Sequence, residues 1–165
     1  MFRLCMCSVV ILCSTFMGNW FAARLKSRRK NLLLIIEAIT RMKNHFAFSG
    51  FEINRVVSES FCGLPCFERF CICDGSTEEF NLWWEKTVES LPSDTGLSRE
   101  DKRLLLRFSD SLGVTDVEGQ ISNCDFYIEV FAQRLKAADA AEDKNSRLYK
   151  ILGFSLGCIV TLVVM

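Results

Sequence analysis

Two runs of sequence without a charged residue lie near the ends of this 165-residue chain, and they constrain its architecture more than any other feature. The first run extends from Leu4 to Ala23 and is twenty residues long. An α-helix of that length covers about 30 Å, which is the thickness of the hydrocarbon core of a bilayer. The first run therefore predicts a membrane-spanning helix.

A cleaved signal peptide is the competing interpretation of the first run. Signal peptides carry their basic residues before the apolar segment, whereas here a basic cluster follows it, and no A-x-A cleavage site is present. Leu12 occupies the position before Cys13 where a lipoprotein signal would have a small residue. We therefore expect the first run to be a retained anchor.

The second uncharged run is ILGFSLGCIVTLVVM, residues 151–165. With Leu148, Tyr149 and an outward-reaching Lys150 it becomes eighteen residues, or about 27 Å as a helix. Tyrosine and lysine are common at the membrane interface, and the run shows no amphipathic period. These features favour a second span over an apolar helix buried in a soluble core.

Both runs have basic residues on the side that faces the middle of the chain, and the positive-inside rule therefore predicts a cytoplasmic middle with both termini on the far side. Such residues usually set topology and bind lipid headgroups, and they can also dock an acidic partner. The candidate topology and docking residues are Arg24, Lys26, Arg28, Arg29, Lys30 and Lys150.

Small residues recur at intervals of four within each predicted span, which allows close packing of helices in lipid. The alternative is that glycine is simply common in membrane helices. The candidate packing residues are Ser14, Gly18, Ala22, Gly153 and Gly157.

The formal net charge of zero is the sum of two unequal parts. The first thirty residues contain six basic residues and no acidic one, whereas the rest of the chain contains fourteen basic and twenty acidic residues. The absence of an overall basic excess argues against a nucleic-acid partner. Because half of the residues are hydrophobic, the chain is also not of a disordered class.

Residues 31–147 show helical periodicity and almost no strand alternation. Two apolar stripes with intervals of three and four begin and end this region, the second of them after a T-x-x-E capping box at Thr115 and Glu118. No proline follows the second stripe, so one long helix is expected to continue from it toward the membrane. The stripes are Leu32, Ile35, Ile39, Met42, Phe46 and Ile121, Cys124, Ile128, Phe131, Leu135, Ala138.

Three shorter helices are predicted between these stripes, at about 51–61, 76–91 and 98–112. Capping boxes begin the second and third, while Pro92 and Gly113 mark their ends. The capping residues are Ser76 with Glu79 and Ser98 with Asp101. The predicted fold is all-α, a compact antiparallel bundle of about six helices flanked by N- and C-terminal transmembrane helices.

Four of the nine cysteines form the group C-x3-C-x4-C-x-C, which in principle could bind zinc or an iron–sulfur cluster. The group lacks the paired C-x2-C spacing typical of such sites, and the interleaved Phe67 and Phe70 indicate ordinary packing. We therefore predict no metal or other cofactor. If the group did bind a metal, its candidate ligands would be Cys62, Cys66, Cys71 and Cys73.

His45 is the only histidine, and its place beside the first stripe favours a partly buried structural role. A Cys–His nucleophile pair has no supporting signature. The chain also lacks the phosphate-binding glycine motifs, the H-E-x-x-H motif and the G-x-S-x-G motif. We therefore predict a protein that is not an enzyme and has no small-molecule substrate.

Three segments carry a resemblance to a known family: GNWFAARLKSRRKNLLLIIEAITRM at 18–42, LSREDKRLLLRFSDSLGVTDVEGQIS at 97–122 and NSRLYKILGFSLGCIVTLVV at 145–164. In this order they resemble stage III sporulation protein AB of endospore-forming bacteria. The chain departs from the family between residues 60 and 80, where it is unusually rich in cysteine. The positions that match the family's L-G-x-S/T-D-x-E-G-Q pattern are Leu112, Gly113, Asp116, Glu118, Gly119 and Gln120.

The resemblance implies a non-enzymatic component of the channel complex between mother cell and forespore, in the mother-cell membrane around the forespore. Its helical bundle is similar to the platform domains of type II secretion and type IV pilus machines, which couple an assembly ATPase to the membrane apparatus. The implied partners are a sister ATPase, stage III sporulation protein AA, and other membrane proteins of the complex.

We therefore expect an anchor with its basic flank at residues 1–26, a cytoplasmic bundle at 27–147 and a second membrane helix at 148–165. The leading hypothesis is a membrane scaffold that docks protein partners. A thiol-based metal or redox sensor on the same bundle is the alternative. A soluble enzyme with apolar termini is a third interpretation, and it would require activity from a chain without catalytic motifs.

Overall fold

The fold is that of a computed structural model, which describes residues 2–48, 52–71 and 77–164. Inside the helices, the side chains of residues 2–11, 77–79 and most of 146–164 lie outside this description. Among the predicted features, Cys73 and Ser76 therefore lie outside the described residues. The same holds for the side chains of Glu79 and Lys150 and for the surroundings of Gly153 and Gly157.

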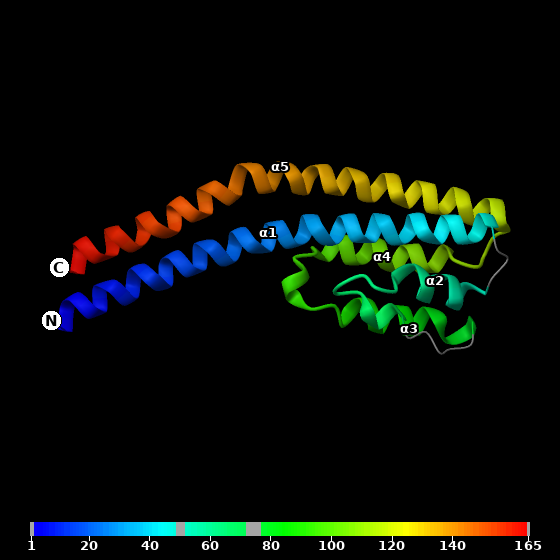
Figure 1. Cartoon of the computed structure of the whole chain (residues 1–165), viewed down its shortest axis with the longest axis horizontal. Coiled ribbons are helices and arrows are strands. Elements are labelled where there is room, and N and C mark those ends of the chain that lie inside the picture. Colours follow the sequence, from blue (N-terminus) through cyan, green and yellow to red (C-terminus); the bar gives the residue numbers. More distant parts are fainter. Residues whose placement is uncertain (1, 49–51, 72–76, 165) are drawn as a thin grey trace.

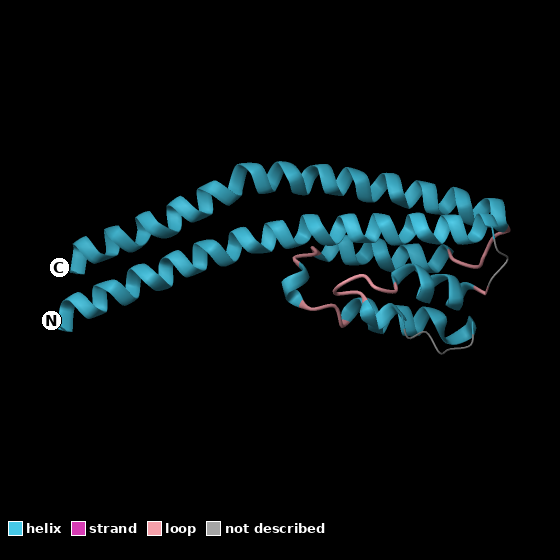
Figure 2. Ribbon diagram, in the orientation of Figure 1, coloured by secondary structure: helices cyan, strands magenta, loops and turns pink. Residues whose placement is uncertain are grey.

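The described part of the chain is helical and contains no strand (Figure 2). This confirms the all-α prediction, with five α-helices in place of the six or so expected. In chain order the elements are α1 (Phe2–Phe48), α2 (Ile53–Phe61), the 3-10 turn η1 (Glu68–Cys71), α3 (Thr77–Glu89), the 3-10 turn η2 (Ser93–Thr95), α4 (Arg99–Ser111) and α5 (Val117–Val164).

Helices α1 and α5 form a long antiparallel hairpin, with both chain ends at the same end of the molecule (Figure 1). The first predicted stripe is buried throughout on α1. On α5, Cys124, Phe131 and Ala138 are buried, and the other members of the second stripe pack partly buried against the same core. Both stripes are therefore confirmed as the faces along which the bundle packs.

Helices α2, α3 and α4 gather beside the C-terminal half of α1, while the N-terminal part of α1 and the C-terminal part of α5 continue well beyond them (Figure 1). The boundaries expected after residues 26 and 147 fall inside these continuous helices. Within the described residues, no helix has a stretch both long and apolar enough to cross a membrane. The two predicted spans are thus not shown.

An aromatic cluster fills the space between α2, η1, α3 and α4. Phe70 stacks on Phe61 with ring centroids 4.7 Å apart and meets Trp84 edge-on at 4.9 Å. Phe67 is also fully buried here, which confirms the packing role predicted for Phe67 and Phe70. Trp84 donates a hydrogen bond of 2.9 Å from Nε1 to the carbonyl oxygen of Leu105 and so satisfies its one buried polar group.

The start of α4 is confirmed as a capping box. The Ser98 hydroxyl accepts from the backbone N–H of Asp101 at 3.1 Å, and the Asp101 carboxylate accepts from the backbone N–H of Ser98 at 2.9 Å. These two hydrogen bonds satisfy backbone donors that the first turn of a helix leaves unpaired.

The capping box predicted at Thr115 and Glu118 is wrong, because α5 begins one residue later. Asp116 caps the helix instead, since its Oδ1 accepts from the backbone N–H of Gly119 at 3.0 Å. The Thr115 hydroxyl is occupied by the side chain of Gln120, which donates to it at 3.0 Å. A hydrogen bond to a side chain five residues later therefore replaces the capping bond that the spacing suggested.

Candidate docking sites

The basic flank of the first apolar run lies on α1 where the turn between α3 and α4 packs against it. Ser27 donates from its hydroxyl to the carbonyl oxygen of Asp94 at 2.7 Å. The Asn31 amide donates to the carbonyl oxygen of Thr95 at 2.8 Å, and both residues are buried. The turn between α3 and α4 is therefore fixed to α1 through its backbone.

Gly96 makes this close approach possible. Its φ is +71°, a left-handed conformation, and a Cβ there would lie 2.5 Å from the carbonyl oxygen of Arg24 and 2.9 Å from the backbone nitrogen of Arg28. A glycine lacks that atom and adopts this φ without steric cost. The turn and the basic flank thus meet backbone to backbone.

Arg28 is used inside the fold. Its Nε and Nη2 donate to the two carboxylate oxygens of Asp101 at 2.8 and 3.2 Å. Asp101 is fully buried, and burial by itself opposes its ionisation. The hydrogen bonds from Arg28 and Ser98 outweigh that effect and hold the pKa of Asp101 below its ordinary value. Arg28 therefore supports α4 and the turn, and is not free to dock a partner.

Arg29 joins α1 to α5. It pairs with Asp139 and lies 3.8 Å from Glu142, and the hydrogen bond with Asp139 raises the pKa of the guanidinium above its ordinary value. Arg24 lies over the ring of Trp20, with its guanidinium carbon 5.8 Å from the ring centroid, which is a cation–π distance.

Lys26 and Lys30 are the exposed cations that remain in this flank. Neither forms an ion pair with a residue that the structure describes. They border a hollow of about 440 Å³ on the surface of α1. We call this hollow the collar pocket; its lining is Ala23, Lys26, Ser27, Arg29, Lys30 and Leu33.

The predicted row of small residues on α1 faces α5. Gly18 and Ala22 are buried and Ser14 is half-buried. Only α5 runs alongside this part of α1 (Figure 1), so the row lies between the two long helices. The matching residues on α5, Gly153 and Gly157, are outside the described side chains.

Among the described members of the cysteine group, Cys62 and Cys71 lie close to each other. Cys62 and Cys66 are exposed, and Cys71 is half-buried. Burial, together with the neighbouring Cys62 thiol, raises the pKa of Cys71. In the described part of the chain, no three His, Cys, Asp or Glu side chains converge as a metal site would require.

His45 is half-buried, and its Nδ1 lies 3.8 Å from a carboxylate oxygen of Glu59. Glu59 also accepts a hydrogen bond of 2.8 Å from Arg55 on the same helix. The histidine therefore lies at the contact between α1 and α2, beside a carboxylate that already forms an ion pair with Arg55.

The six family-motif positions build the connection between α4 and α5. Leu112 is buried, Gly113 has a φ of +78°, and Asp116 caps α5 through Gly119. Gln120 is 4% exposed and donates to Thr115, whereas Glu118 is exposed. These roles are structural and bring no reactive groups together.

Three residues that hold the basic flank in place were not singled out as site residues by the sequence. The sequence indicates Asp101 only as a capping residue of α4, and no other pattern points to it. No sequence pattern indicates Asn31 or Thr95, because their contact joins residues 64 positions apart.

The family comparison matches nearly the whole chain. A family model described as stage III sporulation protein AB matches residues 3–165. No curated protein and no solved structure matches the chain significantly.

Proposed function

Because the chain belongs to the stage III sporulation protein AB family, we propose that it is a non-enzymatic membrane scaffold of the channel complex between mother cell and forespore, where its helical bundle docks the sister ATPase, stage III sporulation protein AA. The family assigns the chain to sporulation. The scaffold and docking roles go further, and the shape and charge of the molecule support them.

The observation that carries the proposal is the pair of long helices that reach beyond the bundle. Large apolar side chains lie exposed along these extensions, including Phe16 at 73% and Met17 at 60% on α1 and Ile151 at 62% on α5. Exposed apolar surface of this extent usually marks a membrane or protein contact. We infer that the extensions anchor the bundle in the mother-cell membrane, with the bundle on the cytoplasmic side.

The collar pocket is the surface that best suits an acidic partner next to such an anchor. Lys26 and Lys30 carry charge that no described residue neutralises, whereas Arg28 and Arg29 are held in ion pairs. Positively charged residues at this position also favour contact with anionic lipid headgroups. The ATPase and the lipid surface therefore compete for the same two lysines in this proposal.

A pull-down of the purified ATPase with the full-length chain in detergent tests the docking role. The double variant Lys26→Glu, Lys30→Glu should retain much less ATPase than the wild type, because it reverses both free charges. Lys136→Glu, an exposed lysine on α5, is the matched control and should retain it fully. Equal retention by all three proteins would refute the docking site, and no retention by the wild type would refute the partner.

The anchoring role is tested separately by labelling single cysteines from each side of the membrane in cells. With the native cysteines replaced by serine, Lys136→Cys should react with an impermeant reagent only after the cytoplasmic side is opened. Labelling of that position from the outside would contradict the proposed topology.

A thiol sensor remains the second candidate, because Cys62 and Cys71 are close enough to influence each other. Elemental analysis of the purified full chain distinguishes the two functions. The scaffold predicts no stoichiometric metal, whereas a metal that is lost in a Cys66→Ser, Cys71→Ser variant would favour the sensor.

A further inference from the structure

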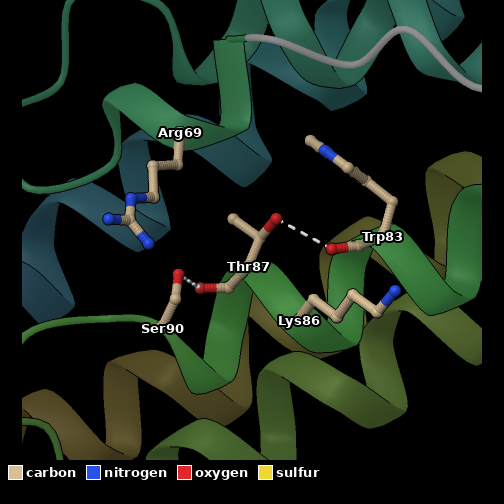
Figure 3. A pocket seen from close by; sticks show the side chains of 5 residues that line it. All are labelled: Arg69, Trp83, Lys86, Thr87 and Ser90. Carbon is tan, nitrogen blue, oxygen red and sulfur yellow. Dashed lines mark hydrogen bonds between the residues drawn. The ribbon is translucent and has the colours of Figure 1, made fainter.

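A second hollow lies on the surface between η1 and α3. It measures about 430 Å³ and is lined by Arg69, Trp83, Lys86, Thr87 and Ser90 (Figure 3). Arg69 comes from η1 and the next three residues from α3, with Ser90 directly after that helix. We call it the η1–α3 hollow. It shares no residue with the collar pocket.

The walls of this hollow are held in place by the aromatic cluster. Phe70, next to Arg69, is fully buried and meets the ring of Trp83 edge-on at 6.0 Å. Positions 83, 86, 87 and 90 are separated by three and four residues, so they form one face of α3. The packing that stabilises the core thus also fixes Arg69 opposite this face.

The charge of the hollow is positive and lacks a partner among the described residues. Neither Arg69 nor Lys86 forms an ion pair there. Thr87 and Ser90 each donate their hydroxyl proton to a backbone carbonyl oxygen at 2.8 Å. The charged donors that line the hollow are therefore the guanidinium of Arg69 and the ammonium group of Lys86.

The two cations do not point at a common centre. The guanidinium of Arg69 turns toward Ser90 and Thr87, whereas the ammonium end of Lys86 points away from it (Figure 3). A neighbouring hollow of about 230 Å³ also includes Arg69 and Ser90 and continues past Glu68 and Pro92. A single small anion would reach only one of the two charges. An extended segment with several carboxylates would reach both.

We propose that the η1–α3 hollow docks an acidic segment of a protein partner, with one carboxylate on Arg69, a second on Lys86, and an apolar side chain against Trp83. A guanidinium binds a carboxylate through two parallel hydrogen bonds. Arginine and tryptophan are the residue types that most often anchor protein interfaces. The proposal is independent of the ATPase and of the collar pocket.

The probe for this proposal is a fluorescein-labelled peptide of about eight residues in which glutamate, tyrosine and glutamate stand at alternate positions, because alternate side chains of an extended segment lie on one face. Its fluorescence polarisation is measured with the full-length chain in detergent. The wild type should bind it, and binding should weaken when salt is raised to about 0.5 M. A peptide with glutamine in place of glutamate should not bind.

The double variant Arg69→Glu, Lys86→Glu should weaken binding of the acidic peptide by about tenfold or more. Lys136→Glu should bind as the wild type does. Both substituted residues are exposed, and circular dichroism checks that the fold is kept. If the charge reversals disturb it, Arg69→Gln, Lys86→Gln should still weaken binding measurably.

The proposal would be overturned by absence of binding by the wild type or by undiminished binding by the hollow variants. It would also be overturned by loss of binding only in Lys26→Glu, Lys30→Glu, which would locate the peptide at the collar pocket. If sedimentation shows that the hollow variants dissociate a self-associated chain and peptide binding is unchanged, the occupant is a second copy and the proposal is also refuted.

Discussion

Asp101 is the residue in which local and tertiary structure meet. The same carboxylate accepts a hydrogen bond from the backbone N–H of Ser98, which caps its own helix, and pairs with Arg28 on α1. It is fully buried, and a buried charge is tolerated only when it is paired and hydrogen-bonded. Removing its charge would therefore affect the cap of α4 and the contact with α1 together.

We expect Asp101→Asn to lower the free energy of unfolding by about 3 kcal/mol, because it leaves a partly buried Arg28 without its counter-charge. Urea denaturation followed by circular dichroism measures the change. Glu100→Gln is the matched control, since Glu100 is in the same turn but its pair with Arg134 is exposed. The control should cost less than about 1 kcal/mol, and equal losses would contradict the prediction.

The same carboxylate should contribute to loss of stability in acid. Its pKa is lower in the folded chain than in the unfolded chain, so it stabilises the fold above its unfolded pKa of about 3.9. That contribution disappears as the pH falls through the folded pKa. The difference in unfolding free energy between wild type and Asp101→Asn should therefore shrink below about pH 4, and a constant difference would count against this assignment.

Cys124 offers a residue-scale test of the interface between α1 and α5. Burial, and to a lesser extent the neighbouring Asp125, raises its pKa to about 12. In the folded chain at about pH 8 it should not react with iodoacetamide, since the thiolate is the reactive form. Exposed Cys66 should react, and both should react in urea. Mass spectrometry of the labelled peptides distinguishes these outcomes, and fast labelling of native Cys124 would show that the interface opens.

At the scale of elements, the contact between η2 and α1 depends on Gly96, and Gly63 provides a control. Both glycines have left-handed φ values, +71° and +77°, but nothing lies within 4 Å of a Cβ at Gly63. Gly63→Ala should therefore cost only the conformational strain, about 1 kcal/mol. Gly96→Ala should cost about 3 kcal/mol or more, because backbone atoms of α1 must also move.

Chemical denaturation of the two glycine variants tests this difference. A similar loss of stability in both would mean that the turn moves away from α1 at little cost. In that case the close approach of η2 would not contribute to the fold.

The elements that could be predicted from sequence are those set by local rules. The stripe on α1 and the capping box of α4 depend on residues at most four apart in sequence, where helical geometry decides which side chains meet. The start of α5 differs from the prediction by one residue, because Asp116 and not Thr115 caps the helix. The η1–α3 hollow could not be predicted, since Arg69 and Lys86 come near each other only through the packing of η1 on α3.

In the whole molecule, basic residues of α1 pair with acidic residues of α5 across the long hairpin. Arg29 and Lys43 on α1 pair with Asp139 and Asp125 on α5. Such exposed pairs each contribute less than about 1 kcal/mol to the free energy of unfolding. They therefore favour one register of α1 against α5 but add little to the stability of the fold. The buried stripes between the helices supply most of the stability.

The extensions of the hairpin present a surface unlike that of the bundle, and Trp20 marks where the two meet. Its ring is 53% exposed and lies under the guanidinium of Arg24. Tryptophan with an adjacent arginine is typical of the interface between hydrocarbon and headgroups. If the extensions insert in a bilayer, this residue is at lipid depth, while Trp83 and Trp84 remain with the bundle in water.

We therefore expect lipids brominated on their acyl chains to quench part of the tryptophan fluorescence of the full-length chain in vesicles. Trp20→Phe should lose that quenching, because it removes the one tryptophan of three that lies outside the bundle. Trp83→Phe is the matched control and should keep it. Quenching that persists in Trp20→Phe would place the bundle itself against lipid, and no quenching in the wild type would exclude the proposed anchor, since the collar would then have no membrane beside it.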